Sequence, residues 1–110
     1  MPNIREQNLI GSLVGSEVTI REYTENLHFA AHVSITPLQF GESVQIRLYI
    51  RVVDADGEKV KDMGQWDFID KTDNEIIYVP WEPPGTKWKL TLTQIGGSPH
   101  NYGFIIYDAP

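Results

Sequence analysis

The sequence contains no cysteine in its 110 residues and has few basic residues. Without cysteine the chain has no disulfide framework, no thiol nucleophile and no thiolate metal site. Nine Lys and Arg stand against fifteen Asp and Glu, which gives a net charge of -6. Because nucleic-acid backbones and anionic membranes are bound by clustered Lys and Arg, we expect neither as a partner.

Long apolar runs are also missing. No stretch approaches the roughly 18 consecutive apolar residues of a spanning helix. The N-terminus lacks a basic patch followed by an apolar segment, as a signal peptide would have. As the sequence stands we expect a cytoplasmic protein, or an extracellular one if the chain is a module of a larger secreted protein.

Apolar and polar residues alternate along most of the chain, as is typical of strands with one buried face. The alternation is clearest over residues 43–54 and predicts further strands at 17–24, 27–36 and 87–95. Residues 76–81 are β-branched and aromatic, residues 58–61 can pair back after a turn, and residues 101–108 form the last segment, so we predict strands there as well. Residues 7–14 would also suit a short helix, but we predict a strand there. Residues 62–74 have no clean period and are predicted to form a long loop.

Gly and Pro residues separate these segments. The turn sequence Asp54-Ala55-Asp56-Gly57 predicts a hairpin between residues 43–54 and 58–61. Pro37 and Gly41 interrupt residues 37–42, where we expect the chain to cross from one sheet to another.

Three segments carry a resemblance at the level of the fold: Gly41-Glu42-Ser43-Val44, the 54–57 turn and Pro83-Pro84-Gly85-Thr86-Lys87-Trp88. They resemble strand starts and turns of immunoglobulin-like or fibronectin-like sandwiches. We predict one all-β domain over residues 1–110, an antiparallel two-sheet β-sandwich of about seven strands, immunoglobulin-like or jelly-roll-like. The predicted core contains Val18, Ile20, Phe29, Val33, Ile46, Leu48, Ile50, Trp88, Leu90, Leu92, Phe104 and Ile106.

The negative charge is concentrated in one stretch. Between residues 54 and 82 nine acidic residues face three lysines, so this stretch carries the whole net charge of -6. Its first turn is not an EF-hand, because Lys59 and Gln65 occupy the positions that need glycine and a bidentate glutamate. A looser calcium site joining this turn to Asp67, Asp70 and Asp73 is the alternative, but we predict no metal and no cofactor.

The three histidines do not predict a zinc site. His28 and His32 lie on one face of a predicted strand, with about 13 Å between their backbones. Joining either of them to His100 would need a fold that the sequence does not specify, so we predict exposed strand histidines.

No pattern predicts catalysis. The sequence has no Gly-x-Ser-x-Gly turn and no phosphate-binding glycine loop. Its carboxylates are numerous, but a glycosidase also needs a walled cleft, which one small sandwich rarely encloses. We therefore predict that the protein is not an enzyme.

The tryptophans outside the predicted core are the first candidates for binding. Trp66 lies in the acidic segment with Asp67 and Asp70, and Trp81 lies between Pro80 and a proline-rich turn. Flat rings beside carboxylates suit a carbohydrate, and a protein partner would use the same residues as anchors. The alternative is that both tryptophans close the ends of the sandwich.

A second candidate surface comes from the polar sides of two strands. Arg47, Tyr49 and Arg51 would adjoin Lys87, Lys89, Thr91 and Thr93 if the two strands were neighbours. A basic face and an acidic end would favour head-to-tail self-assembly, whereas the alternative is an ordinary polar sheet face with cross-strand pairs. We predict a non-catalytic module that binds a carbohydrate or a protein surface, with Tyr49 added to the binding residues. A self-associating structural subunit, as in a coat, fibre or multidomain assembly, is the runner-up.

Overall fold

Strands are the only regular elements in the part of the chain that the computed structural model describes, residues 3–24, 29–51, 59–60, 69–70, 76–82 and 87–108. They are β1 (Asn3–Gly11), β2 (Glu17–Tyr23), β3 (Phe29–Ser34), β4 (Ser43–Arg51), β5 (Lys59–Val60), β6 (Ile69–Asp70), β7 (Ile76–Glu82), β8 (Lys87–Ile95) and β9 (Asn101–Asp108). Within these ranges no helix has the length and apolar character needed to cross a membrane.

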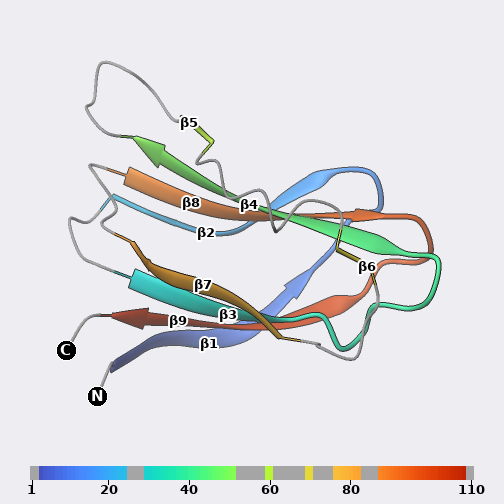
Figure 1. Ribbon diagram of the computed structural model, residues 1–110, viewed down its shortest axis with the longest axis horizontal. Coiled ribbons are helices and arrows are strands. Elements are labelled where there is room, and N and C mark those ends of the chain that lie inside the picture. Colours follow the sequence, from blue (N-terminus) through green and yellow to red (C-terminus); the bar gives the residue numbers. More distant parts are fainter. Residues whose placement is uncertain are drawn as a thin grey trace.

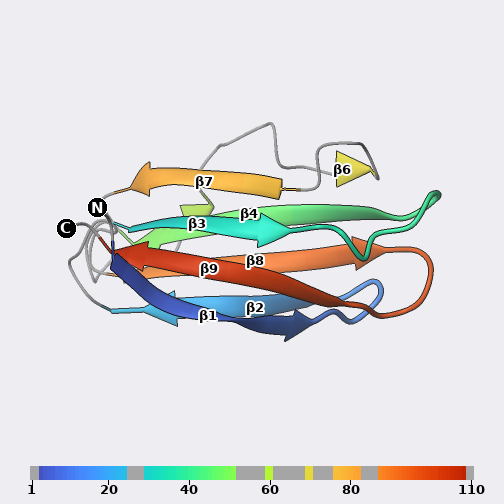
Figure 2. The same ribbon diagram turned by 90° about the horizontal axis from the view of Figure 1, so that it is seen from below.

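The strands form two antiparallel sheets. One sheet has the order β1-β9-β3-β7, and the other has the order β2-β8-β4-β5, with β6 also pairing with β4. Figures 1 and 2 show the sheets as two layers, with the strands of both running along the long axis. The pairing is nested: β1 pairs with β9, β2 with β8, β3 with β7, and β4 with β5 and β6.

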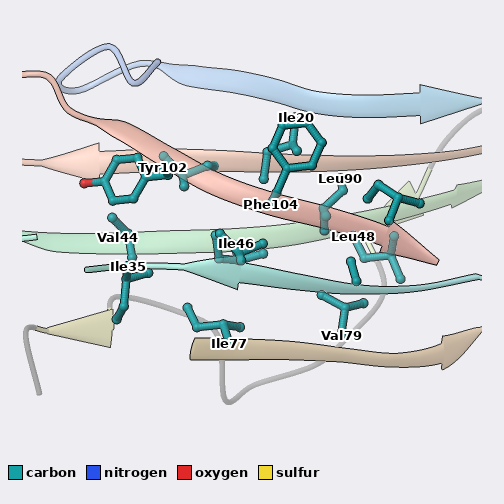
Figure 3. Packing of buried hydrophobic residues seen from close by; sticks show 14 of the residues in the cluster. Ile20, Ile35, Val44, Ile46, Leu48, Ile77, Val79, Leu90, Tyr102 and Phe104 are labelled. Carbon is teal, nitrogen blue, oxygen red and sulfur yellow. The ribbon is translucent and has the colours of Figure 1, made fainter. Parts of the chain in front are cut away.

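The two sheets share one hydrophobic core. Figure 3 shows Ile46 and Leu90 of one sheet and Val79 and Phe104 of the other meeting between the layers. The Phe29 ring also stacks on the Trp88 ring of the opposite sheet, with centroids 3.9 Å apart. Every residue predicted for the core lies in it, and Val18 and Ile50 occupy its partly buried margin. The all-β class and the two-sheet, sandwich-like arrangement are therefore confirmed.

Most predicted strands are confirmed. β8 and β9 begin and end at the predicted residues. The glycine and proline residues between them, Gly96, Gly97 and Pro99, mark the end of β8 and the start of β9. The 37–42 connection joins β3 to β4 and thus crosses between the sheets, as predicted. The pairs Tyr49–Val60 and Ile50–Lys59 show that residues 59–60, the described part of the strand predicted at 58–61, return antiparallel to β4. The 54–57 turn itself lies outside the described residues.

Two segments differ from prediction. A strand does form near residues 7–14, but β1 begins at Asn3 and ends at Gly11. The predicted loop 62–74 contains β6, which pairs with Ser43 and Val44. This pairing is possible because β5 takes up only the other end of β4, leaving the β4 edge beside Ser43 and Val44 to a second strand. The rest of that predicted loop lies outside the described residues.

Candidate functional site

The outer face of the four-stranded sheet is built from two rows of side chains. Residues directly opposite one another on neighbouring strands share a face of the sheet. The ladders align Gln7, Ile105, His32 and Tyr78 in one row. The next row holds Leu9, Gly103, Ser34 and Ile76. These eight residues are called the apolar face, and Figure 2 looks onto this side of the sheet.

A hollow of about 720 Å³ lies in the apolar face. Its floor is low because Gly103 has no side chain and Ser34 has a small one, whereas Leu9 and Ile76 rise on the edge strands. A Cβ atom at Gly103 would lie 3.8 Å from Leu9 Cδ2 and 3.9 Å from Ser34 Cβ, which are ordinary contact distances. The volume is within the range of about 300 to 1,000 Å³ that ligand sites occupy.

An aromatic cluster lies beside the hollow. His32 Nδ1 is 3.0 Å from the Tyr107 hydroxyl oxygen. The His32 ring is tilted by 46° to the Tyr78 ring and by 88° to the Tyr107 ring, with centroids 5.1 and 5.3 Å away. These three rings therefore form an uneven surface rather than a flat platform.

Large apolar side chains of this face are open to solvent. Leu9 is 62% exposed, Ile76 50% and Tyr78 45%. None of the eight residues of the apolar face carries a formal charge at neutral pH when His32 is neutral. Exposed apolar side chains gathered around a depression are typical of an interaction site.

The outer face of the other sheet is polar and charged. The register places Arg47 opposite Thr91, Tyr49 opposite Lys89 and Arg51 opposite Lys87. This confirms the predicted neighbourhood of the two polar strand sides. Acidic residues share the face, because Glu17 lies opposite Thr93 and Glu22 lies opposite Lys89 on the next strand.

Hydrogen bonds tie this charged face together. The Tyr49 and Thr91 hydroxyls donate to Glu17 Oε2 over 2.6 and 2.7 Å. Partial burial acts to raise the pKa of Glu17, but the two hydroxyl hydrogen bonds, together with the positive charges of Arg47 and Lys89, outweigh it and leave the pKa below its ordinary value. Lys89 Nζ lies 4.6 Å from the centroid of the Tyr49 ring. The face is thus a mixed polar surface with cross-strand pairs, not a uniformly basic one.

A buried polar network closes the end of the sandwich where β8 turns into β9. Gln94 Oε1 accepts hydrogen bonds from Ser12 Oγ at 2.7 Å and from the Tyr102 hydroxyl at 2.8 Å. Gln94 Nε2 donates to the carbonyls of Gly96 and Ser98. Burial, together with the charge of a nearby carboxylate, raises the pKa of Tyr102 to about 12. All polar groups of Gln94 are satisfied, which indicates a structural role.

Glu42 extends this network to the 37–42 connection. Its Oε1 accepts the Gln39 N–H at 2.8 Å and lies 2.9 Å from His100 Nε2. The Gln39 hydrogen bond, with a smaller contribution from His100, holds the pKa of Glu42 below its ordinary value. Gly97 has φ +72°, and a Cβ atom there would overlap the Glu42 carboxylate. These contacts hold the β3–β4 connection and the β8–β9 connection together.

The edge strands β1 and β2 are joined by a third polar cluster. Glu6 accepts a 2.6 Å hydrogen bond from Arg21 Nε and a 3.0 Å hydrogen bond from the Tyr23 hydroxyl. The hydrogen bond from Arg21 is the main reason why the pKa of Glu6 lies below its ordinary value. Glu6 therefore links the two sheets at their open side.

The residues predicted for binding are distributed over different parts of the fold. Trp66 and Asp67 lie outside the described residues. The backbones of Asp70 and Trp81 belong to β6 and β7, which lie in different sheets. Tyr49 lies on the charged face, where its hydroxyl is bonded to Glu17. A shared site for these five residues stays a prediction.

The two described histidines lie in different parts of the fold and have different partners. His32 contacts Tyr107, His100 contacts Glu42, and His28 lies outside the described residues. Among the residues with described side chains, no three of the types His, Cys, Asp and Glu come together as metal ligands. The acidic turn at 54–58, together with Asp67 and Asp73, is not part of that description.

The hollow was not predicted from the sequence. The signal for it is a strand that is apolar in both phases of the alternation: β9 has Tyr102 and Phe104 on one side and Ile105 and Tyr107 on the other. Such a strand in a two-layer fold must present one apolar side outward. The start of β7 shows the same pattern, with Ile77 buried and Ile76 exposed.

Comparison of the chain with protein-family models, with curated proteins and with solved structures gives no match.

Proposed function

We propose that this chain is a non-catalytic interaction module that binds a protein surface through the apolar face. The observation that carries the proposal is the contrast between the two outer faces. One is covered by Glu17, Arg47, Lys89 and their hydrogen-bond partners, as expected of a sheet face in water. The other exposes Leu9, Ile76 and Tyr78 around a hollow.

A protein surface suits the apolar face better than a carbohydrate does. Carboxylates are strong acceptors for sugar hydroxyl groups, and the described residues that line the hollow include none. The rings of His32, Tyr78 and Tyr107 are tilted against one another and provide no flat stacking surface. A protein partner supplies apolar side chains that fill a depression, as anchors do at the centres of interfaces. Carbohydrate binding is the alternative, and it rests on Trp66 and Trp81 with Asp67 and Asp70.

Binding without catalysis agrees with the way that the potential nucleophile and bases are engaged. Ser12 Oγ donates to Gln94 and not to a histidine ring. His100 faces Glu42, and His32 faces Tyr107 on an open sheet face. No cofactor is part of the proposal. Nucleic acid and membrane are also left out, because the apolar face lacks the basic residues that they require.

For the type of sandwich we propose a jelly roll rather than an immunoglobulin-like fold. The support is the nested pairing, in which strands from the first half of the chain pair in reverse order with strands from the second half. A hairpin rolled up in this way gives the two Greek keys of a jelly roll. The fold type alone assigns no function.

Photocrosslinking tests the proposed function. A photoreactive amino acid at Leu9 should give one protein adduct in an extract of the cells that make the protein. Filling the hollow by Gly103→Lys should abolish the adduct. The same photoreactive residue at Thr19, which is exposed on the charged face, should give none. Equal adducts from both positions, or no adduct from Leu9, would contradict the proposal, and retention on polysaccharide gels with no adduct would favour the carbohydrate alternative.

A further inference from the structure

Phe40 is the most exposed large hydrophobic side chain among the described residues. Its side chain lies on the connection between β3 and β4 and is 90% accessible to solvent. An aromatic ring of this size removes about 150 to 250 Å² of its own surface from water when it is buried. Within its own chain the ring buries almost none of that surface.

The turn that carries Phe40 is held firmly on both sides. The Leu38 N–H donates to the Ile35 carbonyl at 3.0 Å, and the Leu38 side chain is fully buried. The Glu42 N–H donates to the Gln39 carbonyl at 3.1 Å, and the Glu42 carboxylate accepts the Gln39 N–H. A ring presented by such an ordered turn loses little backbone freedom on binding.

We propose that Phe40 of one copy of this chain inserts into the hollow over Gly103 of a second copy. The inference rests on the proposed function and names the partner for the apolar face. The apolar side chains of Leu9, Ile76 and Ile105 line the hollow together with uncharged polar residues, and its volume accommodates a phenyl ring. The polar residues are Gln7, Asn8, His32 and Ser34. Ring and hollow are both uncharged and lie on the same chain, so each copy offers both halves of the contact.

Charge sets the expected strength and salt dependence of this association. Two copies that each carry a net charge of -6 repel one another at long range, and salt screens that repulsion. The contact itself is apolar and small, so it belongs to the weak class of interfaces. Added salt should therefore strengthen the association, whereas assembly of a basic face on an acidic end would be weakened by salt.

Sedimentation velocity over a range from low micromolar to near millimolar protein tests the proposal with two complementary variants. Phe40→Ser removes the ring, which has no packing to lose. Gly103→Lys fills the hollow on the outer face, where the added Cβ meets only ordinary contact distances. The parent should associate with rising concentration, and each variant alone should show a dissociation constant at least about tenfold higher.

Mixing the two variants is the decisive step. Phe40→Ser keeps an intact hollow and Gly103→Lys keeps an intact ring, so the mixture should form one-to-one pairs at concentrations where neither variant associates alone. Thr19→Lys, which adds the same charge on the opposite outer face, should associate like the parent. Melting temperatures within a few degrees of the parent show that the variants are folded.

Three results would overturn the proposal: a parent that stays monomeric over the whole concentration range, association that Phe40→Ser leaves unchanged, or no pairing in the mixture. A different result distinguishes failure of this proposal from failure of the proposed function. A crosslink from Leu9 to another protein that is lost in Gly103→Lys but kept in Phe40→Ser would retain the apolar face as a binding surface and reject the second copy as its occupant. A parent chain that neither self-associates nor gives the crosslink would reject both proposals.

Discussion

Leu9 of β1 lies directly opposite Gly103 of β9. Gly103 has no side chain, whereas Ile105, the next outward residue of β9, has a large one. The Leu9–Gly103 pair forms a step from a raised edge strand to a low central strand, which makes the hollow a depression in the sheet itself. β9 lies between β1 and β3, so the step is supported on both sides by hydrogen-bonded strands. The floor of the hollow is therefore fixed by the sheet and not by a loop.

Replacing Gly103 by alanine should leave the fold intact and raise its stability by about 0.5 to 1 kcal/mol. The added methyl group meets Leu9 and Ser34 at ordinary contact distances, and an alanine restricts the unfolded chain more than a glycine does. Urea unfolding at neutral pH measures the difference.

Gly97→Ala is the matched control, and it should lower the stability of the fold rather than raise it. The backbone there has φ +72°, and the new Cβ would displace the Glu42 carboxylate from Gln39 and His100. A loss of about 1 to 3 kcal/mol is expected. Destabilisation of similar size at both glycines would contradict the open floor at Gly103.

Glu6→Gln should destabilise the protein at neutral pH and have less effect in acid. The pKa of Glu6 is lower in the folded chain than in the unfolded one, mainly because Arg21 donates to its carboxylate. The stability from this charge is therefore complete above the unfolded pKa of about 4.3 and is lost as pH falls through the folded pKa. We expect a difference of about 1 to 2 kcal/mol at pH ~7 that shrinks toward pH ~3.

The control for Glu6 is Glu22, whose carboxylate is 3.4 Å from Lys87 on the surface. Glu22→Gln should change the free energy of unfolding by less than about 0.5 kcal/mol at neutral pH. A Glu6→Gln effect that is constant over the pH range would contradict the role assigned to its charge.

Leu48→Ala should cost about 2 to 5 kcal/mol, because Leu48 is fully buried between the sheets. Thermal or urea unfolding measures this loss. A cost below about 1 kcal/mol would show that the two layers are not packed on Leu48 as Figure 3 depicts.

Local alternation predicted the strands and the core well where only one side of a strand is apolar. In β8, Trp88, Leu90 and Leu92 alternate with Lys87 and Lys89, so the buried side is unambiguous and all three apolar residues are buried. The adjacency of this strand's polar side to Arg47 and Tyr49 depends in addition on the pairing of β4 with β8, which alternation does not specify.

The hollow could not be found in the same way. Its walls and floor come from opposite ends of the chain, since Leu9 and Gly103 become neighbours only through the nested pairing. In β9 both Phe104 and Ile105 are apolar. The prediction places Phe104 in the core, which is confirmed, but no local pattern tells that Ile105 and Gly103 would line a hollow between Leu9 and Ile76. That arrangement depends on strand order, and strand order depends on long-range contacts that no local pattern encodes.

Calcium should have no effect on stability. The aspartates of the 54–73 segment lack the spacing of an EF-hand, and melting temperatures with calcium and with chelator should agree. Saturation of a real site at a hundred times its dissociation constant would add about 2.7 kcal/mol. An increase in the melting temperature of several degrees on adding calcium would contradict the prediction.

Methyl NMR with a water-soluble paramagnetic probe tests most directly whether the apolar face is the surface through which the chain associates. As protein concentration rises, the methyl groups of Leu9, Ile76 and Ile105 should become shielded from the probe, while those of Thr19 and Thr93 on the charged face stay accessible. Shielding of Thr19 and Thr93 instead, or unchanged accessibility of Leu9, Ile76 and Ile105 at every concentration, would contradict the account.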